Sequence, residues 1–258
     1  MVIILLICTG LLGLCFGSFI HVVIYRFSPD KAALSYLYDI VFSRSKCVYC
    51  YHKLSYLSLI PIISWLIQRG QCRYCHQSIA INYLLVELII SIYCCVMIST
   101  YDCTLWTIIL IFLGLYFIIL AAIDFRYLLL PNYFTYPIML TGLALSYVEI
   151  NPIRLIDGGL GIICGYILLW VPAHLYYYFK KHSGLGGGDI KLLAALGTWI
   201  HYSQLPMLLV FASSIGILYV IFGAYFKKIP LKIVVIPFGP CLLISAYIIL
   251  LQLANYHY

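Results

Sequence analysis

Charged residues are scarce in this chain. Only 9% of its 258 residues are Asp, Glu, Lys or Arg, whereas 65% are hydrophobic, and the mean hydropathy is +1.07. Among the charged residues the acidic ones are fewer, with 8 Asp and Glu against 15 Lys and Arg. Many of the apolar runs are longer than a helix in a soluble core needs. The composition therefore predicts an all-α integral membrane protein.

The N-terminal segment lacks the features of a cleaved signal. Residues 1–20 carry no charge, have no basic stretch at their start and contain no Ala-x-Ala cleavage site. They are therefore expected to remain as a membrane span. The basic residues also form no stripe along one face, which argues against nucleic-acid binding in spite of the net charge of +7.

Apolar runs predict about eight transmembrane helices, at residues 1–20, 79–99, 104–123, 133–150, 157–179, 190–203, 206–226 and 237–253. The sixth is weak, because its helix would rise only about 21 Å through a core of about 30 Å. Three parts follow: a first transmembrane helix at 1–20, a cytoplasmic cysteine loop at 21–78 and a multi-span membrane domain at 79–258.

The basic residues predict the orientation of these helices. If the loop at 21–78 is cytoplasmic, every Lys and Arg except Arg154 faces the cytoplasm. The residues on that side are Arg26, Lys31, Arg44, Lys46, Lys53, Arg69, Arg73, Arg126, Lys180, Lys181, Lys191, Lys227, Lys228 and Lys232. This bias obeys the positive-inside rule and predicts an N-terminus outside, with the large loop inside.

The large loop holds two C-x-x-C pairs, Cys47 with Cys50 and Cys72 with Cys75, separated by 21 residues. This spacing is typical of a four-cysteine zinc site, in which the closed thiolate shell has a structural role. Two disulfides or four idle thiols are the alternatives, and a cytoplasmic location argues against disulfides. Three nearby histidines are interpreted as ordinary polar residues, since four thiolates already complete a zinc shell: His21, His52 and His76.

A run of glycines from Ser183 to Gly188 ends in Asp189, just before an apolar helix. An acidic residue at the start of such a segment is costly unless it has a function. The glycines leave open backbone beside it, against which an extended peptide can lie. Asp124 ends the third predicted span, so both carboxylates are expected at the cytoplasmic membrane edge. Two carboxylates that share one proton can hydrolyse a peptide bond.

Each aspartate also has an ordinary interpretation. Asp189 can be a helix N-cap, and Asp124 can be an interfacial residue paired with Arg126. A phosphate-binding loop is a further alternative for the glycines, but no Gly-Lys-Ser/Thr follows them and no strand precedes them. The segment from Pro237 to Pro240 is most simply the start or kink of a helix.

Several motifs, in their order along the chain, resemble those of the type IV prepilin peptidases. They are the run from Phe16 to Arg26, the two cysteine pairs with 59–65 and 69–73, Asp124 with Leu130-Pro131, and the run from Gly186 to Leu192. The last is similar to the Gly-x-Gly-Asp signature of intramembrane aspartic proteases. Two departures are visible: His21 stands where the family usually has Asn, and Asn132 stands where it usually has Asp.

The resemblance implies a bifunctional enzyme of the bacterial inner membrane. Such an enzyme removes the leader peptide of prepilin-like or pseudopilin proteins at the cytoplasmic face. It then methylates the new N-terminal amine with S-adenosylmethionine. The family's catalytic aspartates match Asp124 and Asp189, and methylation is assigned to the cysteine loop. That loop contains no Gly-x-Gly-x-x-Gly, so the methyl-donor residues stay unassigned, as does the oligomeric state.

Two other classes of function are compatible with parts of the pattern. A transporter or proton channel can use two carboxylates as a relay, although it would need polar residues that continue through the membrane. A docking module would use the cysteine loop to bind a secretion machine and the helices as an anchor. Eight spans are far more than an anchor requires.

Overall fold

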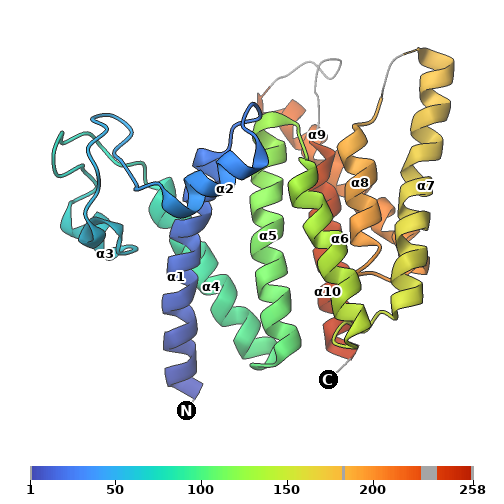
Figure 1. Cartoon of the computed structure of the whole chain (residues 1–258), viewed down its shortest axis with the longest axis horizontal. Coiled ribbons are helices and arrows are strands. Elements are labelled where there is room, and N and C mark those ends of the chain that lie inside the picture. The colour runs from blue at the N-terminus through green and yellow to red at the C-terminus, as the bar shows by residue number, and fades with distance from the viewer. Residues whose placement is uncertain (1, 182–183, 228–236, 257–258) are drawn as a thin grey trace. The chain divides into compact units, whose positions relative to one another are not determined.

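The computed structural model describes residues 2–181, 184–227 and 237–256, and within these ranges it is helical with no strand (Figure 1). Five segments of the described part of the chain are long and apolar enough to cross a membrane. They are α1 (Val2–Arg26), α4 (Asn82–Tyr101), α5 (Leu105–Tyr127), α7 (Leu155–Lys180), and α9 (Leu205–Lys227) with the preceding turn η2 (Tyr202–Gln204). The prediction of a helical membrane protein is confirmed.

The remaining helices are shorter or less apolar. They are α2 (Ala33–Phe42), η1 (Tyr56–Leu59), α3 (Ile63–Ile67), α6 (Asn132–Tyr147), α8 (Gly187–Leu196) and α10 (Phe238–Tyr256). The sixth predicted span corresponds to α8, whose ten residues rise about 15 Å. The predicted count of eight spans therefore stays a prediction, as does the division at residues 20 and 78. Ser183, Lys228 and Lys232 lie outside the described residues.

The chain forms two compact units, Met1–Leu115 and Tyr116–Tyr258. In the first unit, α1 and α4 pack closely because α1 presents glycines to its neighbour. A Cβ at Gly13 would lie 2.7 Å from the Cα of Ser91, and one at Gly17 would lie 2.6 Å from the Cα of Glu87. Small residues of this kind let two membrane helices approach each other through their backbones.

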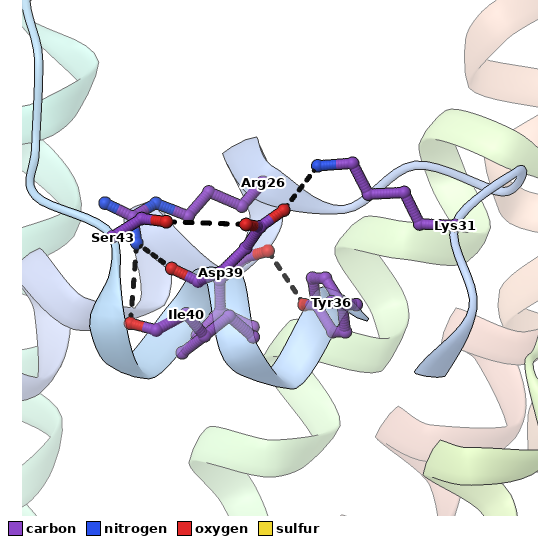
Figure 2. A network of polar contacts seen from close by, with 7 residues as sticks. Arg26, Lys31, Tyr36, Asp39, Ile40 and Ser43 are labelled. Atoms are coloured by element: carbon purple, nitrogen blue, oxygen red, sulfur yellow. Dashed lines mark hydrogen bonds and ion pairs between the residues drawn. The ribbon is translucent and has the colours of Figure 1, made fainter. Parts of the chain in front are cut away.

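The short helix α2 is attached to the end of α1 by the polar network in Figure 2. The guanidinium of Arg26 donates to the backbone carbonyls of Asp39 and Ile40, in the last turn of α2. The buried hydroxyl of Tyr36 donates to the carbonyl of Val23 in α1, at 2.9 Å. Lys31 lies 2.6 Å from the carboxylate of Asp39, and this hydrogen bond lowers the pKa of Asp39. Arg26 thus places a cation and two N–H donors at the C-terminal end of α2, where the negative end of the helix dipole lies.

Replacing Arg26 with Ala is therefore expected to loosen α2 while the spans stay intact. The lost hydrogen bonds correspond to about 1–2 kcal/mol, which amounts to roughly 5–30-fold faster amide exchange in α2. Hydrogen-exchange mass spectrometry of the purified protein measures this change. Lys31→Ala is the control, because an exposed ion pair contributes little. Equal exchange in both variants would contradict the capping role.

The second unit is built around α8, which lies between α6 and α7 in Figure 1. Its core side chains are fully buried, with Leu192, Leu193 and Leu196 each 0% exposed. Gly161 of α7 and Gly197 touch through their backbones, so that a Cβ at either would overlap the other's carbonyl. This packing fixes α8, and with it the glycine-flanked aspartate at its start.

The turn that follows α8 is fixed by hydrogen bonds to neighbouring segments. The indole N–H of Trp199 donates to the carbonyl of Ile138 in α6, at 2.9 Å. The side-chain amide of Asn151 donates to the carbonyl of Thr198, at 3.0 Å. Both donors are buried, so each bond also satisfies a polar group that would otherwise be costly inside the protein.

Candidate active site

Asp124 lies near the C-terminal end of α5 and is almost fully buried, with 5% of its surface exposed. Its Oδ2 accepts a hydrogen bond from the backbone N–H of Gly239, at 3.1 Å. Gly239 is the second residue of α10, so this donor is one of the N–H groups that a helix leaves unpaired at its start. A Cβ at this position would lie 2.6 Å from Oδ2, so the hydrogen bond requires glycine.

Asp189 is half-buried in the first turn of α8, and the residue that caps this helix is Gly186. Its position at the helix start places the carboxylate near the positive end of the helix dipole. The pKa of Asp189 is raised to about 7, chiefly by burial and also by the charge of Asp124, while the backbone amide of Gly186 lowers it. Asp189 is thus a carboxyl group that keeps its proton close to neutral pH.

The two aspartates are brought together in the second unit. Leu130 lies beside a glycine near each aspartate, Gly188 next to Asp189 and Gly239 next to Asp124. A Cβ at Gly188 would lie 3.0 Å from the Cβ of Leu130, and one at Gly239 would lie 3.2 Å from its Cδ1. The thiol of Cys241 is within electrostatic range of both carboxylates. The two aspartates predicted to form a pair therefore share one site. It is formed by the C-terminal end of α5 and the N-terminal ends of α6, α8 and α10.

Neither ordinary interpretation of the aspartates describes their surroundings. Asp189 is not the N-cap of its helix, because Gly186 holds that position. Asp124 bonds to Gly239, while the guanidinium of Arg126 lies over the ring of Tyr127, 5.6 Å from its centre. Among the described residues, Asp124 forms no ion pair with a Lys or Arg. A buried carboxylate without such a partner is expensive, and costly groups of this kind are common in catalytic sites.

Asn132, one of the two departures from the family pattern, begins α6 beside the aspartates. Its side-chain oxygen accepts a hydrogen bond of 3.0 Å from the ammonium group of Lys191. The ammonium group bonded in this way belongs to Lys191, which follows Asp189 by two residues in α8. An amide oxygen can hold the lysine without adding a third negative charge to the site.

The four predicted cysteines converge in the first unit. The sulfurs of Cys47, Cys50, Cys72 and Cys75 all lie within 4.8 Å of one another, and those of Cys47 and Cys75 are 3.8 Å apart. A tetrahedral zinc site with Zn–S bonds of about 2.3 Å has sulfurs about 3.8 Å apart. Four sulfurs around one point suit a single metal ion, whereas two disulfides need two separate pairs.

The two cysteine pairs are held by matching turns. The N–H of Cys47 donates to the carbonyl of His52, and the N–H of Cys72 donates to that of Gln77. In each turn the residue after the second cysteine, Tyr51 or His76, has a positive φ of 56° or 57°. No histidine belongs to the cluster among the described residues, so His52 and His76 are not ligands there.

Sequence reasoning assigned no role to Glu87, a buried acid in α4. It is 7% exposed, and its Oε2 accepts the backbone N–H of Ile62 at 2.8 Å. Ile62 has a φ of 59°, which is unusual for a β-branched residue. Glu87 therefore ties the cysteine loop to α4 at a strained turn. An acidic residue inside an apolar span was the signal that could have revealed it.

Fold and site together define a multi-pass membrane protein with a pair of carboxyl groups, one buried and one half-buried, and a separate four-cysteine centre. The chain belongs to the type IV leader peptidase family: that family's model matches residues 109–221, and the model of the bacterial peptidase A24 N-terminal domain matches residues 11–101. Asp124 and Asp189 both fall within residues 109–221, and all four cysteines fall within residues 11–101.

Curated relatives cover nearly the whole chain. A prepilin leader peptidase/N-methyltransferase of Vibrio cholerae serotype O1 is 36% identical over 95% of both chains. A protein of the same name from Aeromonas hydrophila is 34% identical over 93% of this chain and 88% of its own. A type 4 prepilin-like proteins leader peptide-processing enzyme of Escherichia coli O78:H11 is 29% identical over 89% and 87%. No solved structure shows a significant match.

Proposed function

We propose that this protein cleaves the leader peptide from prepilin-like proteins and then N-methylates the new N-terminal residue. The observation that carries the proposal is the convergence of Asp124 and Asp189, within the region that matches the type IV leader peptidase family. The names of the relatives support both activities.

The carboxylate pair suits hydrolysis of an amide bond. One ionised carboxylate takes a proton from water, whose oxygen then attacks the peptide carbonyl, while the protonated partner donates to the carbonyl oxygen. Breakdown of the tetrahedral intermediate transfers a proton to the departing amine, so the amide bond breaks and one water is consumed. Burial strengthens both interactions, because little solvent competes for the same groups.

The start of α8 provides room for the substrate. Apart from its own turn of helix, a Cβ at Gly187 would meet none of the described residues within 4 Å, so the backbone beside Asp189 is open. An extended peptide needs this kind of access, because its own amides must be free of helical hydrogen bonds. A substrate with an apolar helix and a short basic leader would present such a segment at the membrane edge.

The cysteine centre is proposed to hold a structural Zn²⁺ through Cys47, Cys50, Cys72 and Cys75. Four thiolates close the coordination shell and leave no position for a substrate, so the ion would stabilise the loop. S-adenosylmethionine is the proposed methyl donor, and its reactive methyl group would be transferred to the free α-amine after cleavage. The substrates are proposed to be prepilins or pseudopilins that stay embedded in the lipid bilayer.

The proposed location is the bacterial inner membrane, with the N-terminus outside and the cysteine loop in the cytoplasm. This orientation follows from the positions of the basic residues and places the leader and the methyl donor on the same side. A proton channel fits the structure poorly, because beyond Lys191 the rest of α8, from Leu192 to Leu196, consists of buried leucines and alanines.

Incubation of the purified protein with a prepilin and an isotopically labelled methyl donor tests both activities. We expect mass spectrometry to show loss of the leader and gain of one labelled methyl group on the mature N-terminus. Omission of the methyl donor should leave cleavage intact. An intact prepilin after full incubation would contradict the peptidase, and a cleaved but unlabelled product would contradict the methyltransferase alone.

A further inference from the structure

The two aspartates have different hydrogen-bond environments, although they share one site. Each lies close to a helix N-terminus, Asp189 at the start of α8 and Asp124 beside the start of α10. The dipoles of these helices therefore favour the ionised form of both carboxylates, and they do not distinguish one from the other. The amide of Gly186 also favours the ionised form of Asp189. Among the hydrogen bonds that the structure shows for the described residues, however, the backbone donor to a carboxylate of this pair is that of Gly239, which bonds to Asp124.

Asp124 has a direct backbone donor. The N–H of Gly239 points at its Oδ2 from 3.1 Å, and a donor of this kind stabilises a carboxylate much more than a carboxylic acid. Gly239 also has no side chain between its backbone and Asp124, where any Cβ would collide with Oδ2. This contact is buried, so water does not compete with it.

We infer that Gly239 is a positioning residue that holds Asp124 in its ionised form, so that Asp124 accepts the proton from water and Asp189 carries the proton donated to the carbonyl. This inference rests on the proposed peptidase function and assigns a role to each aspartate. It also gives the segment from Pro237 to Pro240 a role beyond starting α10.

The surroundings of Asp189 agree with this assignment. Burial and the charge of Asp124 keep the pKa of Asp189 at about 7, although the Gly186 amide opposes them. Among the described residues, the other titratable groups nearby are the Cys241 thiol and Lys191, whose ammonium group is bonded to Asn132. Cleavage is therefore expected to fall as the pH rises through about 7, because Asp189 then loses the proton that it must donate.

Infrared spectroscopy tests the assignment without relying on activity. Near about pH 6, a buried protonated carboxyl gives an absorption band separate from those of carboxylates. We expect this band in the wild-type protein and in Asp124→Asn, and we expect Asp189→Asn to lack it. A band that disappears in Asp124→Asn and persists in Asp189→Asn would overturn the inference. If both variants instead cleaved prepilin normally, the proposed function itself would fail.

A matched pair of glycine variants tests the role of Gly239. Gly239→Ala would displace Asp124 from its donor, whereas a Cβ at Gly186 would lie 3.2 Å from Oδ2 of Asp189. In a plot of cleavage rate against pH, the acidic limb reports the ionisation of Asp124 and the alkaline limb that of Asp189. We expect Gly239→Ala to move the acidic limb to higher pH by about one to two units. Gly186→Ala should move the alkaline limb upward instead.

The control for these variants is Gly223→Ala in α9, where a Cβ would meet nothing within 4 Å. Its pH profile is expected to match that of the wild type. A general loss of folding would lower the rate in Gly239→Ala without moving either limb, and that result would overturn the positioning role. A shift of the alkaline limb in Gly239→Ala would also overturn it, because the roles of the aspartates would then be reversed.

Discussion

Replacing Asp124 or Asp189 with Asn is expected to stop leader cleavage, with a rate loss of about 10²–10⁴-fold for either variant. Asn has nearly the same shape as Asp but can neither accept nor carry the proton that hydrolysis requires. The two groups act as a unit, so the double variant should be hardly slower than either single variant. The measurement is the fraction of prepilin cleaved by purified enzyme over time.

Asp102→Asn is the matched control, because Asp102 is an exposed acid in the connection between α4 and α5. It should cleave at the wild-type rate. All three variants are expected to insert into the membrane, since the change removes a charge from the protein. Full processing by either Asp124→Asn or Asp189→Asn would show that the residue concerned is not catalytic.

Removal of the proposed zinc ion is expected to unfold the cysteine loop. Structural zinc contributes about 10–16 kcal/mol in small zinc-binding peptides, and a loop with few buried side chains has little else to replace it. Cys72→Ser should abolish zinc binding, because Cys72 is the ligand that is buried, at 4% exposure. We expect elemental analysis to find no zinc and limited trypsin digestion to cut the loop.

Cys103→Ser is the control for this variant, because Cys103 is an exposed cysteine outside the cluster. It should keep its zinc and its resistance to trypsin. A strong chelator should reproduce the effect of Cys72→Ser in the wild-type protein. Retention of zinc by Cys72→Ser would show that the four sulfurs do not form the site.

The helical class and the location of both candidate centres could be predicted because each depends on a local pattern. Long apolar runs specify membrane helices, and the C-x-x-C spacing specifies where two pairs of sulfurs can meet. Asp124 and Asp189 could be predicted as a pair because the charge bias and the ends of the predicted spans together predict both at one membrane edge. These inferences need no knowledge of how the helices pack.

The remaining features depend on packing between segments far apart in the chain. Gly239 is 115 residues from Asp124, and nothing in the local sequence reveals that its N–H reaches that carboxylate. The bond from Ile62 to Glu87 likewise depends on how the loop folds back onto α4. Whether the sixth predicted span crosses the membrane stays a prediction, because hydropathy does not distinguish a short buried helix such as α8 from a crossing one.

The close enclosure of α8 by its neighbours has a consequence for which molecule must deform during cleavage. A segment locked by backbone contact at Gly161 and Gly197 has little freedom to adjust to different clients. The substrate must then change its conformation instead, by unwinding at the scissile bond before it is cut. Substrates with helix-breaking residues at the scissile bond would be cleaved fastest. The cleavage rate would then depend on how stable the substrate's helix is at that point.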